Sequence, residues 1–271
     1  MKSSLRKPLL TCFTAALTMF AHSILGGSTM FAQESPTITK PKVILFDVNE
    51  TLLDLKGLQA SVGKALGGRE DLLPLWFSTM LHHSLVDSAT ERYHNFGDIG
   101  VAALMMVAQN NGIELSETDA RKAIVTPLRS LPPHADVKDA LKTLKERGYK
   151  LVSFTHSSNQ GVKTQFENAG LIDFFDERLS VEDIKTYKPN LKSYQWACKK
   201  LGVEPGEAMM VAAHGWDCAG IKAAGLQSVF VSRPGKAMYP LGLPPDLVVK
   251  DLNELVEKLH ELDETKTIKS E

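Results

Sequence analysis

Four short polar segments of the sequence stand at or shortly after the ends of strand-like stretches. Asp47 follows the apolar run Val43–Phe46 and opens the segment Asp47-Val-Asn-Glu-Thr51. The other three segments are Thr155-His-Ser-Ser158, Lys188-Pro189 and Ala212-Ala-His-Gly-Trp-Asp217. Continuous apolar runs of this kind are typical of strands buried on both faces of a parallel sheet. Because the carboxyl ends of parallel strands converge, we expect the four segments to form one site.

The residue types in these segments suit nucleophilic catalysis by a carboxylate. Asp47 is the candidate nucleophile, because a carboxylate held in line with a reacting carbon can form an ester that water then hydrolyses. Lys188 is expected to pair with Asp47 and to lower its pKa. Taken singly, Lys188 fits a solvated loop residue equally well, and Thr51 and Thr155 fit caps of a helix or turn. Because all three residues are expected at the same edge of the sheet, a shared catalytic site is favoured over these separate roles.

The sequence around these segments alternates strands and helices. Helical stretches end at Gly148, Gly170 and Gly225, where glycine favours termination of a helix. Strands are expected at residues 43–46, 149–154, 177–180, 208–212, 227–231 and 247–249. This repetition predicts an α/β fold with a doubly wound, Rossmann-like parallel sheet and right-handed crossovers.

One block interrupts the alternation. Between residues 58 and 133 the apolar residues, Trp76 and Phe77 among them, recur at three- and four-residue spacing without a strand pattern. We therefore expect a helical cap inserted into an α/β core made of residues 42–57 and 134–255. Residues 33–41 are expected to be a linker and residues 256–271 a polar C-terminal tail.

The first 32 residues have the order of an export signal. Three cations among the first seven residues precede an apolar run, which small residues follow up to Ala32. We expect cleavage near Ala32 and an exported protein, periplasmic or secreted. The alternative is an uncleaved membrane anchor, which the polar residues within the run disfavour.

Charge and cysteine content narrow the function classes. The 31 basic and 32 acidic side chains of the 271-residue chain give a formal net charge of −1, so no basic field favours nucleic acid as a partner. Beyond the signal the cysteines are Cys198 and Cys218. An oxidising compartment would let them pair, whereas their apolar helical context favours buried thiols. No metal-ligand cysteine spacing is present.

The order and spacing of the four segments resemble the haloacid dehalogenase-like (HAD) hydrolases over about residues 42–252. Within this superfamily the resemblance is strongest to the L-2-haloacid dehalogenases of type II. It is carried by Asp71-Leu-Leu-Pro-Leu-Trp-Phe77, Arg92-Tyr-His-Asn-Phe96, Lys188-Pro-Asn-Leu-Lys-Ser-Tyr194 and Trp216-Asp217. The resemblance implies hydrolysis of a short 2-haloalkanoic acid to the 2-hydroxy acid through an ester on Asp47. It also implies no cofactor, and a homodimer.

The resemblance gives roles to further residues. Thr51 and Thr155 would donate hydrogen bonds to Asp47 or to the substrate carboxylate. Asp217 would hold Lys188 and help to order water. Residues assigned to substrate contacts are Asn49, His156, Tyr194 and Trp216.

A magnesium-dependent phosphatase of the same superfamily is the main rival. Such an enzyme needs an acid two residues after the nucleophile, where this chain has Asn49, whose amide cannot act as a general acid. It also needs a strong magnesium ligand at the position of Ala213, which has no side-chain oxygen. Both residues favour chemistry without a metal. A third hypothesis is an exported, non-catalytic binding protein with this fold, which the joint retention of the site residues disfavours.

The sequence departs from the dehalogenase pattern at Asp87. An ungapped match from Trp76 to Phe96 places Asp87 where the family has the arginine that receives the halide, and an anion cannot do so. The donors left open are His83, His156, Asn49 and Arg92.

A second departure is His214, where the family usually has asparagine. Glu50 lies in the first polar segment, at a neighbouring strand end. A histidine oriented by a carboxylate is a competent general base near neutral pH. We hypothesise that Glu50 and His214 form a dyad that activates the ester-hydrolysing water. The alternative, given equal weight, is a surface Glu50 and a hydrogen-bonded loop histidine.

Overall fold

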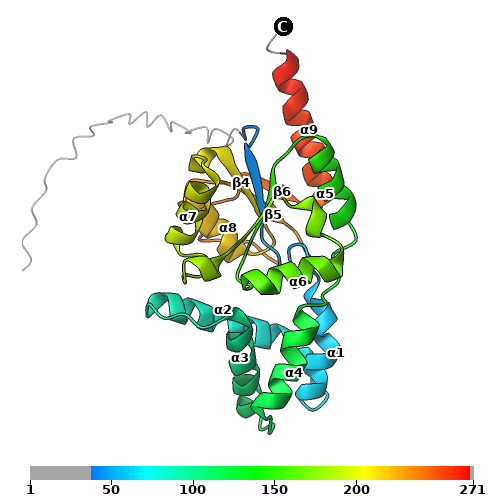
Figure 1. Cartoon of the computed structure of the whole chain (residues 1–271), viewed down its shortest axis with the longest axis vertical. Helices are drawn as coiled ribbons and strands as arrows, with labels where there is room; N and C mark the ends of the chain where they lie inside the picture. The colour runs from blue at the N-terminus through cyan, green and yellow to red at the C-terminus, as the bar shows by residue number, and fades with distance from the viewer. Residues whose placement is uncertain (1–37, 269–271) are drawn as a thin grey trace, which may run out of the picture. The chain divides into compact units, whose positions relative to one another are not determined.

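The computed structural model describes residues 38–268 of the chain (Figure 1). The predicted export signal and residues 33–37 of the predicted linker lie outside the described residues. Within residues 38–268, no helix has the length and apolar character needed to cross a membrane.

The core is a six-stranded parallel sheet in the order β3-β2-β1-β4-β5-β6. The strands are β1 (Val43–Phe46), β2 (Leu151–Thr155), β3 (Glu177–Ser180), β4 (Ala208–Ala212), β5 (Gln227–Val231) and β6 (Leu247–Val249). Every residue of β1, β2 and β4 is buried, as the continuous apolar runs predicted. The strand order runs outward in both directions from β1 and β4, which confirms the doubly wound fold and places the switch point of the sheet at Asp47.

Helices connect the strands and cover both faces of the sheet. They are α5 (Val137–Glu146), α6 (Asn159–Ala169), α7 (Leu191–Leu201), α8 (Gly215–Ala223) and α9 (Leu252–Ile268). Helix α5 packs against α9 on one side of the sheet, and α7 packs against α8 on the other (Figure 1). Cys198 of α7 and Cys218 of α8 are buried free thiols, so they do not pair.

The inserted block consists of α1 (Gln59–Ala65), α2 (Leu73–Ala89), α3 (Phe96–Asn110) and α4 (Glu117–Leu128). These helices pack on one another beyond the end of the sheet at which the polar segments lie (Figure 1). Trp76 is fully buried in this block, and its indole Nε1 donates to the carbonyl of Gly100 over 2.8 Å. The side chain is therefore part of the core of the cap, as its helical spacing indicated.

The C-terminal segment differs from the sequence-based expectation. Residues 256–268, predicted as a polar tail, continue helix α9. Leu252, Leu255 and Leu259 are fully buried at three- and four-residue spacing, so this face of the helix packs on the core. Glu257, His260 and Glu264 are exposed on the outer face of the same helix.

Removal of this apolar contact is expected to destabilise the protein. Leu259→Ala lowers the free energy of unfolding by about 2–5 kcal/mol, the usual range for deleting a fully buried leucine side chain. Urea denaturation followed by circular dichroism measures the change. Glu257→Ala, on the exposed face of the same helix, is the control. Equal midpoints for the two variants would show that the segment contributes no packing.

Candidate active site

The centre of the site is the side chain of Lys188, which is fully buried between two carboxylates. Its ammonium Nζ lies 3.0 Å from Asp47 Oδ1 and 2.7 Å from Asp217 Oδ2. It also donates to the carbonyl of Phe154 over 3.1 Å, so three acceptors match the three N–H groups. The sequence segments that contain these residues are therefore brought together as predicted.

The ionisation of Asp47 follows from this arrangement. Burial would raise the pKa of the Asp47 carboxyl, but the positive charges of Lys188 and His214 outweigh it and hold that pKa far below its usual value. For Lys188, burial alone would lower the pKa of the ammonium group, and the negative charges of Asp217 and Asp47 raise it instead. Asp47 is thus a carboxylate, and Lys188 a cation, at neutral pH.

The two threonines have different positions. Thr51 Oγ1 donates to Asp47 Oδ2 over 2.7 Å and accepts from the backbone N–H of Ala213 over 3.0 Å. Thr155 Oγ1 accepts from the N–H of Ser157 over 3.1 Å, the geometry of a turn cap. Thr51 therefore contacts the nucleophile. The contact of Thr155 is local and is the turn cap that the sequence also allowed for this residue.

Tyr194 and Asp217 form the support of Lys188. The Tyr194 hydroxyl donates to Asp217 Oδ1 over 2.6 Å, which leaves Oδ2 for Lys188. Burial, together with the charge of Asp217, raises the pKa of Tyr194 well above its usual value, so the hydroxyl remains a donor. Gly220 makes this contact fit, because a Cβ at that position would lie 2.5 Å from the Tyr194 oxygen.

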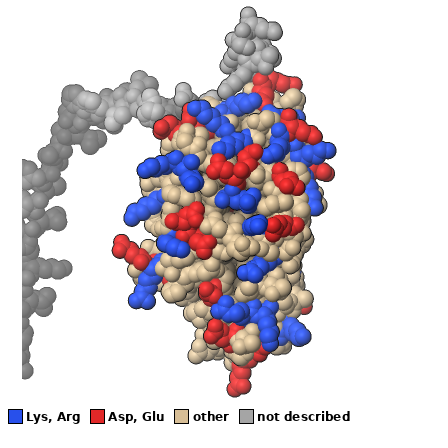
Figure 2. Space-filling model, viewed as in Figure 1, with Lys and Arg blue, Asp and Glu red and all other residues tan. Residues whose placement is uncertain are grey.

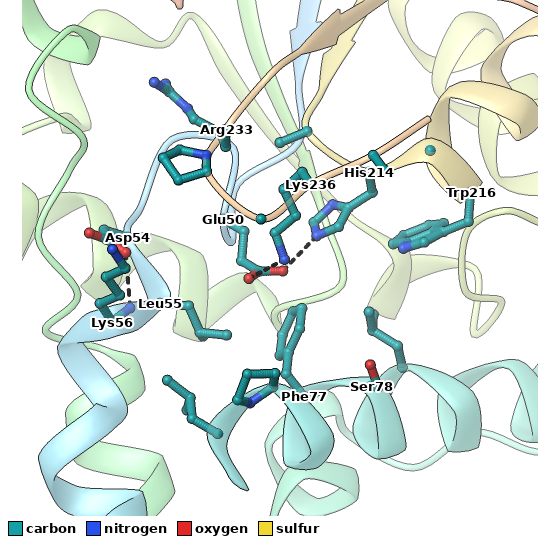
Figure 3. A pocket seen from close by; sticks show the side chains of 18 of the residues that line it. Glu50, Asp54, Leu55, Lys56, Phe77, Ser78, His214, Trp216, Arg233 and Lys236 are labelled. Atoms are coloured by element: carbon teal, nitrogen blue, oxygen red, sulfur yellow. Dashed lines mark hydrogen bonds and ion pairs between the residues drawn. The ribbon is translucent and has the colours of Figure 1, made fainter. Parts of the chain in front are cut away.

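A second group of charged side chains consists of Glu50, His214 and Lys236, which converge on one another (Figure 3). His214 Nε2 lies 2.8 Å from Glu50 Oε2, and Lys236 forms an ion pair with Oε1 of the same carboxylate. His214 Nδ1 lies 3.3 Å from Asp47 Oδ2 but makes no well-aligned hydrogen bond among the described residues. The structure thus joins Glu50 to His214 as hypothesised, and places His214 against the nucleophile as well.

A general base must be neutral before it accepts a proton, whereas His214 is protonated in the free site. Burial opposes its positive charge, but the close contact with Asp47, the hydrogen bond to Glu50 and the charges of both carboxylates outweigh burial and raise the pKa of His214 to about 9. At neutral pH the free site therefore holds His214 as a cation.

The backbone of the first polar segment is held in an unusual conformation. Glu50 has φ +64°, in the left-handed region that costs a non-glycine residue about 1 kcal/mol or more. Its N–H donates to Leu53 O over 2.8 Å, and its carbonyl oxygen lies 3.1 Å from His134 Nε2. Strain of this kind is retained where the surroundings require it. Here it aims the Glu50 carboxylate at His214.

Sequence reasoning missed two cations, Arg233 and Lys236, which follow β5. The Arg233 guanidinium donates twice to Thr51 O, over 3.1 and 3.0 Å, and pairs with Asp136 at 2.7 Å. The loop lies so close to α8 that a Cβ on Gly215 would approach the Tyr239 N–H to 2.5 Å. Because β5 ends at the same edge of the sheet, the strand-end rule that selected the other segments could have found this one.

His156 and Trp216 form an aromatic wall beside Lys188. Burial, and then the charge of Lys188, lower the pKa of His156 well below its usual value, so its ring is neutral. The Trp216 ring lies between two imidazoles, with centroids 5.7 Å from His156 and 5.2 Å from His214. Trp216 Nε1 and His156 Nε2 are buried without a hydrogen-bond partner in the described part of the chain.

Other sequence-predicted residues point elsewhere. The Asn49 amide contacts Ser157 Oγ at 3.3 Å and accepts from Gln165 of α6 at 2.9 Å. Asp87 is buried and accepts from the N–H of His94 over 2.8 Å, so it fixes the turn between α2 and α3. Arg92 is exposed at the same turn. The substrate contact predicted for Asn49 stays a prediction.

A cavity of about 480 Å³ opens onto the Glu50 and His214 side of the site. Phe77 of the cap, Trp216 and Lys236 are among its lining residues (Figure 3). Asp47 is not among its lining residues, whereas His214, whose Nδ1 lies 3.3 Å from Asp47 Oδ2, is one of them. Within residues 38–268, no group of three or more acidic, histidine or cysteine side chains is arranged to hold a metal ion.

Comparison with known proteins identifies the family from the sequence and shows the same fold in solved structures. Residues 41–225 match the model of the haloacid dehalogenase-like hydrolases. The chain is 31% identical to the (S)-2-haloacid dehalogenase of Pseudomonas sp. (strain YL), over 80% of its own length and 93% of the relative. It is 27% identical to haloacetate dehalogenase H-2 of Moraxella sp. (strain B), over 80% and 97%.

A solved structure of similar fold is the L-2-haloacid dehalogenase of Xanthobacter autotrophicus. The TM-score is 0.76 at 24% identity, and the match covers 81% of this chain and 98% of that one. The same enzyme with chloropropionic acid covalently bound matches with a TM-score of 0.75.

The surface carries both signs of charge interspersed, without a large field of one sign on the face drawn in Figure 2. This mixture agrees with the formal net charge of −1.

Replacement of Lys188 by an uncharged residue is expected to destabilise the folded protein. Lys188→Met leaves two buried carboxylates without their counter-ion and lowers the free energy of unfolding at pH 7 by about 3–5 kcal/mol. The loss shrinks as the pH falls toward 4, because carboxyl groups without the ammonium have raised pKa values and take up protons. Urea unfolding at several pH values measures both effects.

Lys222→Met is the matched control for this variant. It removes a partly buried lysine that pairs with Asp246 at 2.7 Å outside the site. Its loss is expected to be about 1 kcal/mol or less. A pH-independent loss in Lys188→Met would contradict the ionised state assigned to the two acids.

Proposed function

The chain belongs to the haloacid dehalogenase-like hydrolases, and from that membership we propose that it hydrolyses the carbon–halogen bond of short 2-haloalkanoic acids. The product is the 2-hydroxy acid. The observation that carries this proposal is the ionised Asp47 carboxylate at the switch point of the sheet, paired with a buried Lys188. The relatives of similar sequence are named for the same substrate class.

The first step is displacement of the halide by Asp47. One carboxylate oxygen attacks the carbon that bears the halogen, a carbon–oxygen bond forms, and the halogen leaves with the bonding electron pair. Lys188 and Thr51 orient the carboxylate through contacts of 3.0 and 2.7 Å. Such orientation replaces the entropy cost of bringing two free reactants into line.

The second step is hydrolysis of the ester on Asp47. Water attacks the ester carbonyl carbon, and the bond between that carbon and the substrate oxygen breaks, so the carboxylate is restored. His214 is placed to take the proton of this water, because its Nδ1 faces Asp47 while Glu50 holds Nε2. The proposed reaction uses an aspartate and water and requires no cofactor.

The departing halide needs a donor other than Asp87. We propose that the Trp216 indole N–H receives it, since this nitrogen is buried without a partner among the described residues and its ring lies beside the Lys188 ammonium. Lys188 Nζ lies 5.9 Å from the centre of the Trp216 ring. His156, one of the donors left open by the sequence, packs beside Trp216 with ring centroids 5.7 Å apart, but its neutral ring donates to the Lys188 backbone and leaves Nε2 as an acceptor.

Phosphate transfer is the second candidate, and the site disfavours it. The Asn49 amide is bound to Gln165 and cannot protonate a leaving oxygen. Ala213 offers only a methyl group at the position where a phosphatase needs an oxygen ligand.

Export and homodimerisation remain proposals about the whole protein. The order of basic, apolar and small residues in the first 32 positions supports export with cleavage near Ala32. Expression in a bacterial host should give a periplasmic protein whose first residue is Gln33, as N-terminal sequencing measures. A cytoplasmic protein that retains Met1 would contradict it. The mass of the purified protein by light scattering tests the dimer.

The proposed reaction predicts release of halide from L-2-chloropropionate or bromoacetate at an undiminished rate with a chelator present. Asp47→Asn should lower this rate by about three orders of magnitude or more, because the amide is not a nucleophile. Ion chromatography measures the halide, and mass spectrometry of the trapped enzyme detects the ester on Asp47. Trp216→Phe should slow ester formation and halide release by the same factor, because one displacement step produces both.

An aryl phosphate with and without Mg²⁺ is the counter-experiment. Metal-dependent release of phosphate without release of halide would replace the dehalogenase proposal with the phosphatase. Absence of both activities would favour the non-catalytic binding protein.

A further inference from the structure

The imidazole of His214 has a carboxylate on each side, and only one of them changes its charge during the proposed reaction. We propose that the charge of Asp47 controls the protonation of His214, so that formation of the ester on Asp47 converts His214 from a cation into the general base. This inference rests on the proposed function and deepens it, because it says when the base is produced. Ester formation would thereby produce the base that ester hydrolysis requires.

The geometry separates the two carboxylates by role. Nε2 makes a direct hydrogen bond to Glu50 at 2.8 Å, and that contact remains throughout the reaction. Nδ1 faces Asp47 Oδ2 at 3.3 Å and has no well-aligned hydrogen bond among the described residues. The Asp47 carboxylate acts on Nδ1 through this close contact and through its negative charge, and both contributions are lost once Asp47 becomes an ester.

The charges around the site balance before substrate arrives. Three carboxylates face three cations: Asp47, Glu50 and Asp217 against Lys188, Lys236 and His214. The ester removes one negative charge, which departs with the halide. The protein groups alone then carry one excess positive charge, which the substrate carboxylate of the ester offsets only if it lies near His214. The negative charge that faced Nδ1 is gone, and this loss favours release of the His214 proton.

Other groups near His214 do not offset this change. Phe77 of the cap and Trp216 of α8 cover the ring with centroids 6.2 and 5.2 Å away, and neither carries a charge. His156, at the end of β2, is neutral because burial and the Lys188 charge lower its pKa. The carboxylate of the substrate is present both before and after ester formation. Among the described groups, Asp47 is the one whose charge changes in this step.

The electrostatics support the direction of the effect. Burial lowers the pKa of His214, and the two carboxylates raise it to about 9 in spite of burial. Loss of an opposite charge within about 4–6 Å changes a pKa by roughly 1–3 units, which brings His214 toward neutrality at physiological pH.

Lys236 is a positioning residue in this arrangement. Its ion pair satisfies one oxygen of Glu50. Burial would raise the pKa of that carboxyl, but His214 first and then Lys236 lower it. Without Lys236 the full charge of Glu50 would hold the proton on His214 even after Asp47 is esterified. Lys236 therefore makes the protonation of His214 responsive to Asp47.

The proton balance of the cycle follows. Ester formation breaks the carbon–halogen bond, releases halide and frees the His214 proton to solvent through the cavity that His214 lines. In hydrolysis neutral His214 takes one proton of the attacking water, the other stays with the hydroxy acid, and Asp47 returns as carboxylate. The sum is one halide and one proton released for each water consumed.

The primary test needs no turnover. Titration of His214 by NMR of imidazole-labelled protein compares the unaltered chain with Asp47→Asn, in which the amide has the shape of the carboxyl group without its charge. We expect the His214 pKa near 9 to fall by about 1–3 units in the variant. An unchanged pKa would overturn the proposal. Circular dichroism verifies that Asp47→Asn is folded.

The second test follows the proton during a single turnover of bromoacetate in weak buffer with a pH indicator. Release of one proton together with ester formation is the expected result. Release of that proton only with ester hydrolysis would overturn the proposal while leaving the dehalogenase function intact. Absence of ester and of halide would instead contradict the proposed function, and the NMR titration would still decide the coupling.

The pH dependence of ester hydrolysis in Lys236→Met distinguishes a role through His214 from a purely structural role of Lys236. The variant should accumulate the Asp47 ester at pH 7 by tenfold or more, and its hydrolysis should recover as the pH rises. Lys222→Met removes a lysine of similar exposure from another partly buried ion pair and should keep the profile of the unaltered protein. A loss of activity in Lys236→Met that is the same at every pH would contradict the role of Lys236.

Discussion

The site depends on the buried ammonium group of Lys188. Placement of an unpaired charge in a protein interior costs several kcal/mol or more, so such a group persists only with counter-charges and hydrogen-bond acceptors on all sides. Here Asp47, Asp217 and the carbonyl of Phe154 supply them. The same contacts keep Asp47 ionised, so the requirement that stabilises the lysine also prepares the nucleophile.

The doubly wound sheet makes this arrangement possible. Asp47, Thr155 and the segment before Asp217 belong to the ends of three adjacent strands, β1, β2 and β4. In a parallel sheet these ends lie side by side, and the partly positive N-termini of the following helices face the same edge. The helical insertion lies over that edge and brings Phe77 against His214. Burial of the charged groups is thus a consequence of topology, and it strengthens every interaction among them.

Much of this could be predicted from sequence because the signals are local. Apolar runs predicted the strands. The polar segments at or shortly after the strand ends pointed to Asp47, Lys188, His214 and Asp217 as site residues. Helix α9 was missed although Leu252, Leu255 and Leu259 have helical spacing, because the charged residues between them dominate the composition of the segment. The protonation state of His214 had no local signal. It depends on Asp47 and on Lys236, which is distant in sequence and reaches Glu50 only through the loop after β5.

The balance of charge also constrains how a haloacid lies in the site. A substrate carboxylate placed against His214 would replace the negative charge lost from Asp47 and would keep the histidine protonated. Ester hydrolysis then requires that the carboxylate be held away from His214, on the far side of Asp47 near Lys188. Thr51 and His214 both face Oδ2 of Asp47, whereas Lys188 holds Oδ1. The two oxygens therefore have unequal surroundings, and this asymmetry gives the bound acid one orientation in which the cycle can be completed.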